Sequence, residues 1–270
     1  MNKLIEIENL NYSVRSNSIL NEGEEKIILK NISLEVKKNE IIGITGESGS
    51  GKTTLIKLIA GILKPSSGEI KFTPAKDWEN IKTNPVQILF QNNNEILNPF
   101  RKIEDIVEEA ILLRSKSKLN IASEKEIIFN SVGFTDELRK RKGFELSGGE
   151  QQRAALSRIL AAKPELLILD EPFSAQDVES QLNLLNLFKK INGEFNLTMI
   201  CVAHNLKILR KLADRIFVIY NGEIVESGNT SEIFNSPKND YTKFLLKCEN
   251  YNLKYEDLKF KINLTEQSSE

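Results

Sequence analysis

The most constraining feature of the sequence is a glycine-rich segment that lies between a short apolar run and a helical pattern. The segment, residues 46–53, reads GESGSGKT and fits the P-loop pattern of Gly, four residues and Gly-Lys-Thr. The apolar run at 41–44 before it is typical of a buried parallel strand. After it, leucines and isoleucines recur at helical spacing as far as Ile62, and Lys64-Pro65 is expected to end the helix. The sequence therefore predicts a strand, a phosphate-binding loop and a helix in direct succession.

The residue types of this segment suit phosphate binding. Glycines let backbone N–H groups turn inward around an anion, and the start of the following helix adds a partial positive charge. Lys52 is expected to reach the β- and γ-phosphates of a nucleotide, and the Thr53 hydroxyl to ligate Mg²⁺. A glycine-rich turn without a ligand is the alternative interpretation. The predicted nucleotide-binding residues of the loop are Gly46, Glu47, Ser48, Gly49, Ser50, Gly51, Lys52, Thr53 and Thr54.

The composition excludes several other kinds of chemistry. The chain of 270 residues has one histidine, His204, and two cysteines. Zinc sites with several histidines, four-cysteine metal sites and disulfide frameworks are therefore excluded. A net charge of −1 gives no basic field for nucleic acid. No apolar run approaches the ~20 residues that span a bilayer, and the N-terminus lacks the apolar core of a signal peptide, so a cytoplasmic location is expected.

Periodic patterns divide the chain into segments. The first 40 residues alternate as β-strands do, and residues 92–158 are polar and helix-patterned. Within the polar stretch, residues 123–126 are predicted to form a capping box that opens a helix through Val132. Strand–helix alternation then resumes, and two strands are expected around a turn at Asn221-Gly222. The expected boundaries are a core of 1–91 and 159–235, a helical insert of 92–158, together forming one domain of 1–247, and a tail of 248–270.

A second apolar run ends in two carboxylates. Residues 166–169 read LLIL and are followed by Asp170 and Glu171. Because the C-terminal end of a buried parallel strand opens onto the ligand crevice of its sheet, Asp170 is expected to hold the Mg²⁺ shell. Glu171 is expected to act as a general base on the attacking water. Apolar strands that end in Asp-Glu are common, so this pattern gains weight only beside the P-loop.

The third motif is the segment LSGGEQQR at 146–153. Ser147 and Glu150 have the spacing of a capping box, and a capped helix start with two glycines offers bare N–H groups to a phosphate. An ordinary capped helix is the alternative. The segment resembles the signature of ABC-family ATPases. The positions that match this signature are Ser147, Gly148, Gly149 and Glu150.

The resemblance covers residues 3–247 and links the three motifs. It implies an α/β fold: a P-loop NTPase core with a mainly parallel sheet, an N-terminal antiparallel β subdomain and an inserted α-helical subdomain that carries the signature. In this family two cassettes pack head to tail, and each ATP lies between the P-loop of one and the signature of the other. Because this chain has one copy of each motif, the resemblance implies a second cassette, identical or different, for hydrolysis of ATP with Mg²⁺.

Four further residues match positions that have roles in the family. Gln91 matches the glutamine that contacts Mg²⁺ and the transmembrane partner, and Asp177 matches the aspartate of the D-loop, although Gln176 stands where leucine is usual. His204 matches the histidine that contacts the γ-phosphate. Tyr12 lies where the family has an aromatic ring stacked on adenine, with an ordinary core or surface tyrosine as the alternative. The resemblance thus implies Glu171, His204 and Gln91 as catalytic residues and Thr53, Gln91 and Asp170 as Mg²⁺ ligands.

Several stretches are similar to ATPase subunits of oligopeptide, dipeptide and nickel importers. They are the GESGSGK spelling of the P-loop, ILNP at 96–99, and the C-terminal stretches 222–228, 234–237 and Tyr241-Thr242. RKGF at 141–144 and Asn239-Asp240 depart from that group, which usually has Tyr-Pro-His and His-Pro there. The resemblance implies an ATPase that powers import of peptides or nickel on the cytoplasmic face of the membrane. Its implied partners are two transmembrane permease subunits at the helical insert and, indirectly, a substrate-binding protein, but no nucleic acid.

Two other functions stay open. One is a soluble ABC ATPase that acts on DNA or ribosomes, although such proteins usually carry tandem cassettes, a long coiled coil or zinc modules. The segment between Lys52 and Ser147 has no sustained heptads and no cysteine pairs. The other is a metabolite kinase that uses the P-loop alone, which would leave the signature segment without a purpose.

Overall fold

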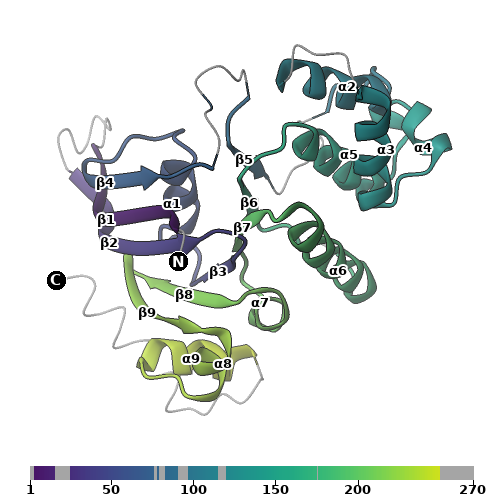
Figure 1. Cartoon of the computed structure of the whole chain (residues 1–270). Helices are drawn as coiled ribbons and strands as arrows, with labels where there is room; N and C mark the ends of the chain where they lie inside the picture. Colours follow the sequence, from purple (N-terminus) through teal and green to yellow (C-terminus); the bar gives the residue numbers. More distant parts are fainter. Residues whose placement is uncertain are drawn as a thin grey trace. The chain divides into compact units, whose positions relative to one another are not determined.

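The fold is described from a computed structural model of the chain. The structure describes residues 3–15, 25–75, 78, 83–90, 97–114, 120–174 and 176–249. These residues divide into two compact units, each of which is described by itself. The helical unit comprises Met1–Leu4, Lys37–Ile41 and Phe72–Cys201, and the P-loop unit comprises Ile5–Val36, Ile42–Lys71 and Val202–Glu270. Figure 1 labels their helices and strands.

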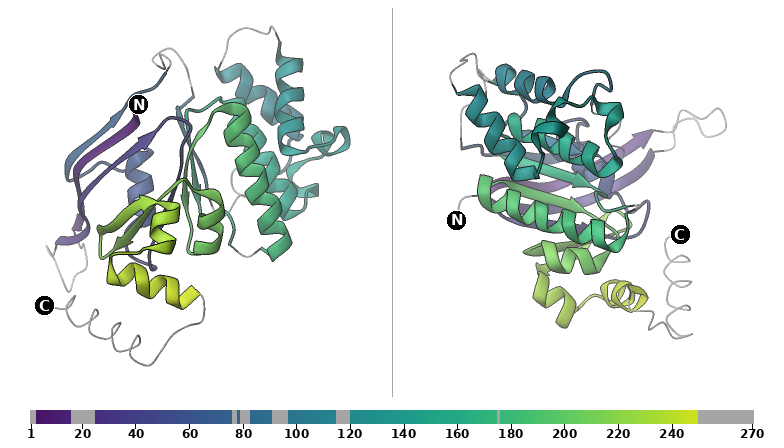
Figure 2. Two further views of the ribbon diagram at one scale, coloured as in Figure 1. Left: turned by 60° about the horizontal axis from the view of Figure 1, so that its bottom comes forward. Right: turned by 90° about the vertical axis from the view of Figure 1, so that its right-hand side faces the viewer.

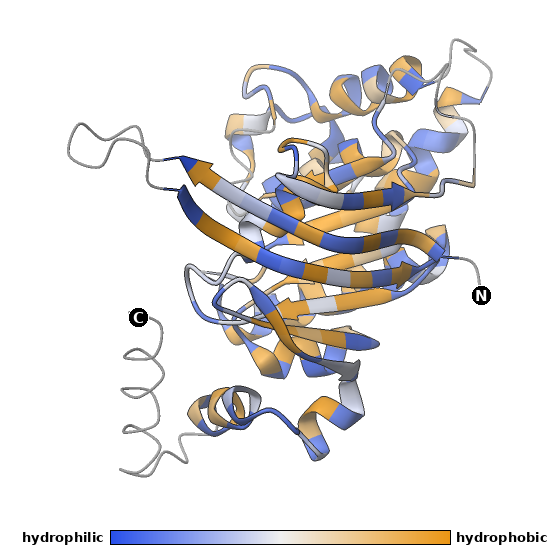
Figure 3. Ribbon diagram, turned by 90° about the vertical axis from the view of Figure 1, so that its left-hand side faces the viewer, coloured by the Kyte–Doolittle hydropathy of each residue, from blue (hydrophilic) through white to orange (hydrophobic). Residues whose placement is uncertain are grey.

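The P-loop unit contains a three-stranded antiparallel sheet in the order β2-β1-β4. The strands are β1 (Lys3–Arg15), β2 (Glu25–Lys37) and β4 (Ser67–Phe72). Hydrophobic and hydrophilic residues alternate along the two long strands, as Figure 3 shows. Because successive side chains of a strand point to opposite faces, this alternation buries one face of the sheet and leaves the other polar. The N-terminal antiparallel sheet is confirmed.

A second group of strands in the P-loop unit carries the nucleotide loop. Here β3 (Ile41–Thr45) pairs in parallel with β8 (Arg215–Tyr220), and β8 pairs antiparallel with β9 (Glu223–Asn229). The turn between β8 and β9 has positive φ at both Asn221 (48°) and Gly222 (81°), which a type I′ hairpin turn requires. The predicted strand pair and its turn are confirmed. The helices of this unit are α1 (Lys52–Ile59), α7 (Leu206–Leu212), α8 (Thr230–Asn235) and α9 (Asp240–Glu249).

The helical unit contains three short neighbouring strands and five α-helices among its described residues. The strands β5 (Val86–Leu89), β6 (Leu166–Asp170) and β7 (Thr198–Val202) lie side by side in that order, and β5 and β6 are parallel. The helices are α2 (Ile103–Arg114), α3 (Ile121–Val132), α4 (Asp136–Lys140), α5 (Gly148–Ala161) and α6 (Val178–Phe195). Helix α5 contacts both α2 and α3, and Figure 2 shows the three together. The predicted α/β class with a helical insert is confirmed.

Helix α1 ends earlier than the sequence pattern suggests. It was expected to run towards Pro65, but it ends at Ile59 because Gly61 takes a left-handed backbone, with φ 71°. The Ile62 N–H donates to the Lys57 carbonyl (2.9 Å), and the Gly61 N–H donates to the Leu58 carbonyl (3.0 Å). These two bonds form a Schellman end, which satisfies carbonyls that would otherwise lack partners.

Helix α3 begins before its predicted start, and the prediction of a capping box at 123–126 is wrong. The residue before the helix is Asn120, whose φ is 72° and whose side chain makes no cap bond. Ser123 lies inside the first turn, where its hydroxyl donates to the Asn120 carbonyl (2.9 Å). Serine therefore bonds back to the preceding turn here instead of capping the N–H groups that follow it. The predicted end at Val132 is confirmed.

Candidate functional site

The P-loop joins β3 to α1 in the P-loop unit and packs closely against neighbouring strands. A Cβ atom on Gly46 (φ 148°) would lie 2.0 Å from the carbonyl oxygen of Ile219, and one on Gly51 (φ 103°) would lie 2.5 Å from Cδ2 of Leu29. Both the backbone angle and the lack of space therefore require glycine at these positions. The tip of the loop, at Ser48, is exposed. The base of the loop is thus fixed while its tip stays open to a ligand.

The side chain of Lys52 lies inside the turn of the loop. Lys52 is only 6% exposed, and its Nζ donates to the carbonyl oxygens of Gly46 (2.9 Å) and Glu47 (2.7 Å). Thr53 follows in the first turn of α1 and is exposed. An ammonium group held within a glycine-rich loop at the start of a helix is an arrangement that suits phosphate binding. The geometry therefore suits the phosphate-binding role predicted for this loop.

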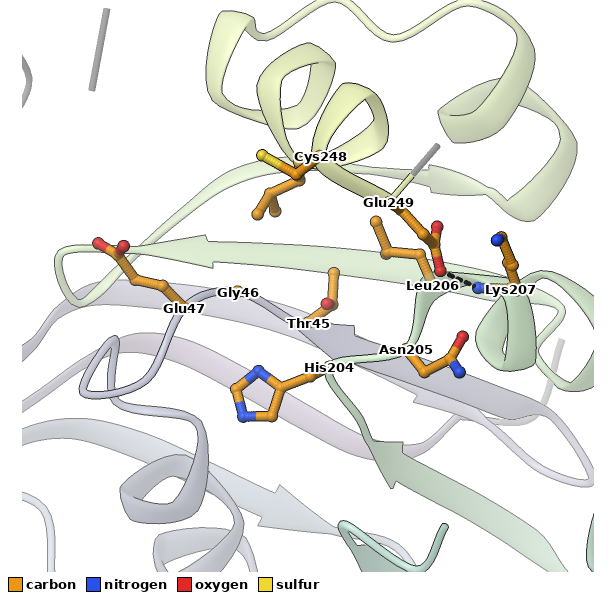
Figure 4. A pocket seen from close by; sticks show the side chains of 10 residues that line it. Thr45, Gly46, Glu47, His204, Asn205, Leu206, Lys207, Cys248 and Glu249 are labelled. Atoms are coloured by element: carbon orange, nitrogen blue, oxygen red, sulfur yellow. Dashed lines mark hydrogen bonds between the residues drawn. The ribbon is translucent and has the colours of Figure 1, made fainter. Parts of the chain in front are cut away.

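His204 lines the same cavity as the start of the P-loop. It is exposed and lies between β7 and α7, whose N-cap Asn205 accepts a hydrogen bond from the Ile208 N–H (3.2 Å). The cavity has a volume of about 530 Å³, and Gly46, Glu47 and His204 line one side of it, as Figure 4 shows. The structure thus brings the predicted phosphate loop and the predicted γ-phosphate contact to one cavity within the P-loop unit.

The two predicted carboxylates lie at the end of a buried strand in the helical unit. Asp170 is the last residue of β6, and Glu171 follows it with a left-handed backbone, at φ 49°. This conformation is strained for a residue that has a side chain. The carbonyl of Glu171 accepts hydrogen bonds from the N–H (3.2 Å) and the hydroxyl (2.8 Å) of Ser174, which hold the tight turn. The turn therefore fixes the backbone of Glu171 directly beyond the strand.

The signature residues form the N-terminal end of α5 in the helical unit. The Ser147 N–H donates to Glu150 Oε2 (2.8 Å), and the Glu150 N–H donates to Ser147 Oγ (3.4 Å), so the predicted capping box is present. The bond from the Ser147 N–H lowers the pKa of the Glu150 carboxyl. Gly148 and Gly149 are exposed, and a Cβ atom on either would meet nothing within 4 Å. The fold itself therefore does not require glycine at these two positions.

Gln152 connects the signature helix to the loop that follows Glu171, a link that sequence analysis did not single out. Its side chain is 4% exposed, and its Nε2 donates to the Pro172 carbonyl (3.1 Å). Its Oε1 accepts a hydrogen bond from Nε2 of Gln176 (2.9 Å). Gln176 stands where the family usually has leucine, so this departure places a polar side chain against a buried polar partner. That departure was the one signal in the sequence that pointed to this contact.

Three further residues were predicted to belong to the site: Asp177, Tyr12 and Gln91. Asp177 is the N-cap of α6, and hydrogen bonds from the N–H (2.9 Å) and hydroxyl (2.8 Å) of Ser180 hold the pKa of its carboxyl below the usual value. Tyr12 is half-buried on β1 of the P-loop unit. Gln91 lies outside the described residues. The roles of these three residues stay predictions.

The chain is similar in sequence to a known family and to curated proteins of that family. A family model described as ABC transporter matches residues 29–174. Among curated relatives, the oligopeptide transport ATP-binding protein OppF of Streptococcus pyogenes serotype M1 is 35% identical over 254 residues, which cover 90% of this chain and 81% of the relative.

Two solved structures are similar over most of the chain. One is cbiO1 from Clostridium perfringens, described as part of the ABC transporter complex cbiONQ, with a TM-score of 0.75, 25% identity, and coverage of 97% of this chain and 100% of that one. The other is a dimeric, post-hydrolysis state of the ATP-binding cassette MJ0796 bound to ADP and Pi, with a TM-score of 0.68 and 26% identity. The aligned region covers 84% of this chain and 98% of the MJ0796 chain.

Proposed function

This chain belongs to the ABC transporter family and is an ATPase of that family, and from this premise we propose that it powers a membrane importer of peptides. The sequence resemblance allowed peptides or nickel as cargo. The relative OppF, which is named for oligopeptide transport, supports peptides. The cassette is proposed to work as one half of a dimer, as the dimeric cassette MJ0796 suggests.

Nucleotide binding is assigned to the P-loop unit. The amides of the P-loop and the Lys52 ammonium group would bind the β- and γ-phosphates, and the ring of Tyr12 would stack on adenine. The proposed Mg²⁺ ligands are the Thr53 hydroxyl, the Asp170 carboxylate and the Gln91 amide. All three offer oxygen atoms, which are the donors that Mg²⁺ prefers, so the set fits this ion. The bound ion would neutralise charge on the phosphates.

Hydrolysis is assigned to Glu171 and His204. The Glu171 carboxylate would take a proton from the attacking water, and the His204 imidazole would donate a hydrogen bond to the γ-phosphate. Asp177 would lie at the seam between two cassettes. Ser147, Gly148, Gly149 and Glu150 would contact the ATP that is bound to the partner's P-loop.

One observation carries this proposal: the signature helix begins with two glycines that the fold does not need. A Cβ atom on Gly148 or Gly149 would occupy open space, and neither residue has positive φ. Glycine lowers helix stability by about 1 kcal/mol relative to alanine, so its presence in the first turn needs another reason. Close approach of a phosphate from a second cassette supplies one, because N–H groups of a helix start bind anions best when no side chain intervenes.

Replacing Gly149 with Ala separates this role from folding. We expect ATP hydrolysis by the assembled protein to fall about 100-fold, since the methyl group would displace the partner's phosphate from the helix start. ATP binding to the isolated chain and the melting temperature should be unchanged, or the latter slightly raised. Gly193→Ala in α6 is the matched control, because a Cβ atom there also meets nothing within 4 Å. Full activity in Gly149→Ala would contradict the proposed contact.

Recovery of the chain from membranes tests the import function. In the part of the chain that the structure describes, no helix is both long and apolar enough to cross a membrane. From the similarity to importer ATPases, we propose that permease subunits bind the chain at its helical insert. Solubilised in detergent from membranes of its own organism, it should co-purify with two transmembrane subunits and hydrolyse ATP faster when peptide-loaded binding protein is added. Co-purification with DNA or ribosomes instead would overturn the import function.

A further inference from the structure

Helix α9 is fixed at its start by hydrogen bonds to β9. The Glu226 carboxylate accepts hydrogen bonds from the backbone N–H groups of Lys238 (2.7 Å) and Asn239 (3.0 Å). Asn239 Oδ1 in turn accepts a hydrogen bond from the Tyr241 N–H (2.9 Å) at the first turn of the helix. These bonds fix the backbone of the first turn of α9, from which the side chain of Tyr241 projects.

Tyr241 reaches from α9 to the P-loop. Its side chain is 4% exposed, and its ring lies against the ring of Tyr220, with centroids 4.2 Å apart. Its hydroxyl oxygen accepts a hydrogen bond from the Glu47 N–H (2.9 Å). The first corner of the phosphate loop is therefore attached to a helix near the C-terminal end of the described chain.

The peptide unit between Gly46 and Glu47 is held from both sides. Its carbonyl oxygen, on Gly46, accepts a hydrogen bond from Lys52 Nζ, and its N–H, on Glu47, donates to Tyr241. Were Lys52 to turn to the phosphates of ATP, its hydrogen bond to this carbonyl would be lost, and the bond to the Tyr241 hydroxyl would remain. The Tyr241 hydrogen bond therefore opposes a flip of this peptide.

The other end of α9 contacts the helix that follows His204. Glu249 Oε1 accepts a hydrogen bond from the Lys207 N–H (2.6 Å) in the first turn of α7, as the dashed line in Figure 4 shows. A carboxylate at a helix start is also favoured by the helix dipole. Between the two contacts, α9 lines the cavity that Gly46 and His204 share.

We propose that α9 is a brace for the nucleotide site, in which Tyr241 and Glu249 are positioning residues for the P-loop and for the His204 segment. The inference rests on the proposed ATPase site and adds two residues to it that act without touching the substrate. Tyr241 holds the backbone of the phosphate loop in its conformation. Glu249 holds the first turn of α7, the helix that follows His204, in position. Loss of the first contact should weaken binding, and loss of the second should slow turnover.

Tyr241→Phe tests the contact with the P-loop, because it removes the hydroxyl and keeps the ring. We expect the affinity of the full-length protein for a fluorescent ATP analogue to fall about 3- to 10-fold, the size of one lost hydrogen bond, and the melting temperature to fall by no more than a few degrees. Tyr220→Phe is the matched control, since it removes a hydroxyl from the other ring of the same pair and should leave affinity unchanged. Equal affinities for wild type and Tyr241→Phe would overturn the brace and leave the ATPase assignment standing. A wild-type protein that binds no ATP would overturn both.

Glu249→Ala tests the second contact. In the protein assembled with its partners, we expect kcat to fall several-fold while KM for ATP stays the same, because the His204 segment loses its anchor but the P-loop does not. Glu249→Gln keeps an oxygen acceptor for the Lys207 N–H and should restore most of the turnover. A loss that appears only as a lower melting temperature, or one that glutamine does not rescue, would contradict a positioning role.

Discussion

Replacing Glu171 with Gln is expected to stop ATP turnover while leaving ATP binding intact. Glutamine has the same shape as glutamate but cannot take a proton from water, so general-base catalysis is lost, which is worth about 100- to 10,000-fold in rate. The backbone at this position has φ 49°, and both side chains face the same strain there. The fold should therefore tolerate the change.

Three measurements define this result. Phosphate release by the assembled protein should fall to background, the affinity for ATP should match that of the wild type, and dimers with bound ATP should accumulate on size-exclusion chromatography. Glu223→Gln is a suitable control, because it makes the same chemical change at an exposed position on β9. Phosphate release at the wild-type rate in Glu171→Gln would show that another group activates the water.

Replacing His204 with Ala is expected to reduce ATP hydrolysis about 100-fold, the usual effect of losing one hydrogen-bond donor to the transition state. The residue is exposed and lines the cavity beside Gly46, so the free energy of unfolding should change by less than about 0.5 kcal/mol. The combination of lost turnover and unchanged stability would distinguish a contact with the γ-phosphate from a structural histidine.

The single histidine of the chain makes this test direct. Because His204 is the only one in the sequence, its imidazole proton signals in an NMR spectrum need no assignment. Addition of Mg²⁺ and a non-hydrolysable ATP analogue should shift these signals in the wild type but not in Lys52→Ala, which lacks the main cation of the loop. Near-wild-type ATPase activity in His204→Ala, measured with its partners, would contradict the assignment.

The parts of the site that could be predicted are those whose structure is encoded within a few residues. The P-loop needs only its own glycines and lysine, with a strand before it and a helix after it. The capping box of Ser147 and Glu150 closes within three residues, and the hairpin at Asn221-Gly222 depends on two residues that accept positive φ. In each case the local pattern leaves one favourable backbone conformation.

The parts that were missed depend on distant segments or on competition between local signals. Tyr241 and Glu47 are 194 positions apart, and nothing in either neighbourhood indicates that they share a hydrogen bond. The apolar spacing that continues to Ile62 suggested a longer α1, but the freedom of Gly61 to adopt positive φ decided where that helix ends. Contacts between distant segments and the backbone freedom of glycine therefore determine features that the periodicity of the sequence alone does not predict.

The left-handed backbone at Glu171 has a consequence for how such a protein can evolve. A residue with a side chain in this conformation costs about 1–2 kcal/mol, and glycine at the same position would remove that cost. Natural domains have only about 5–15 kcal/mol of total stability, so the difference is not negligible. Selection for heat resistance alone would favour glycine at position 171, and selection for turnover would favour glutamate. If Glu171 is the general base that we propose, the chain gives up this stability in exchange for catalysis.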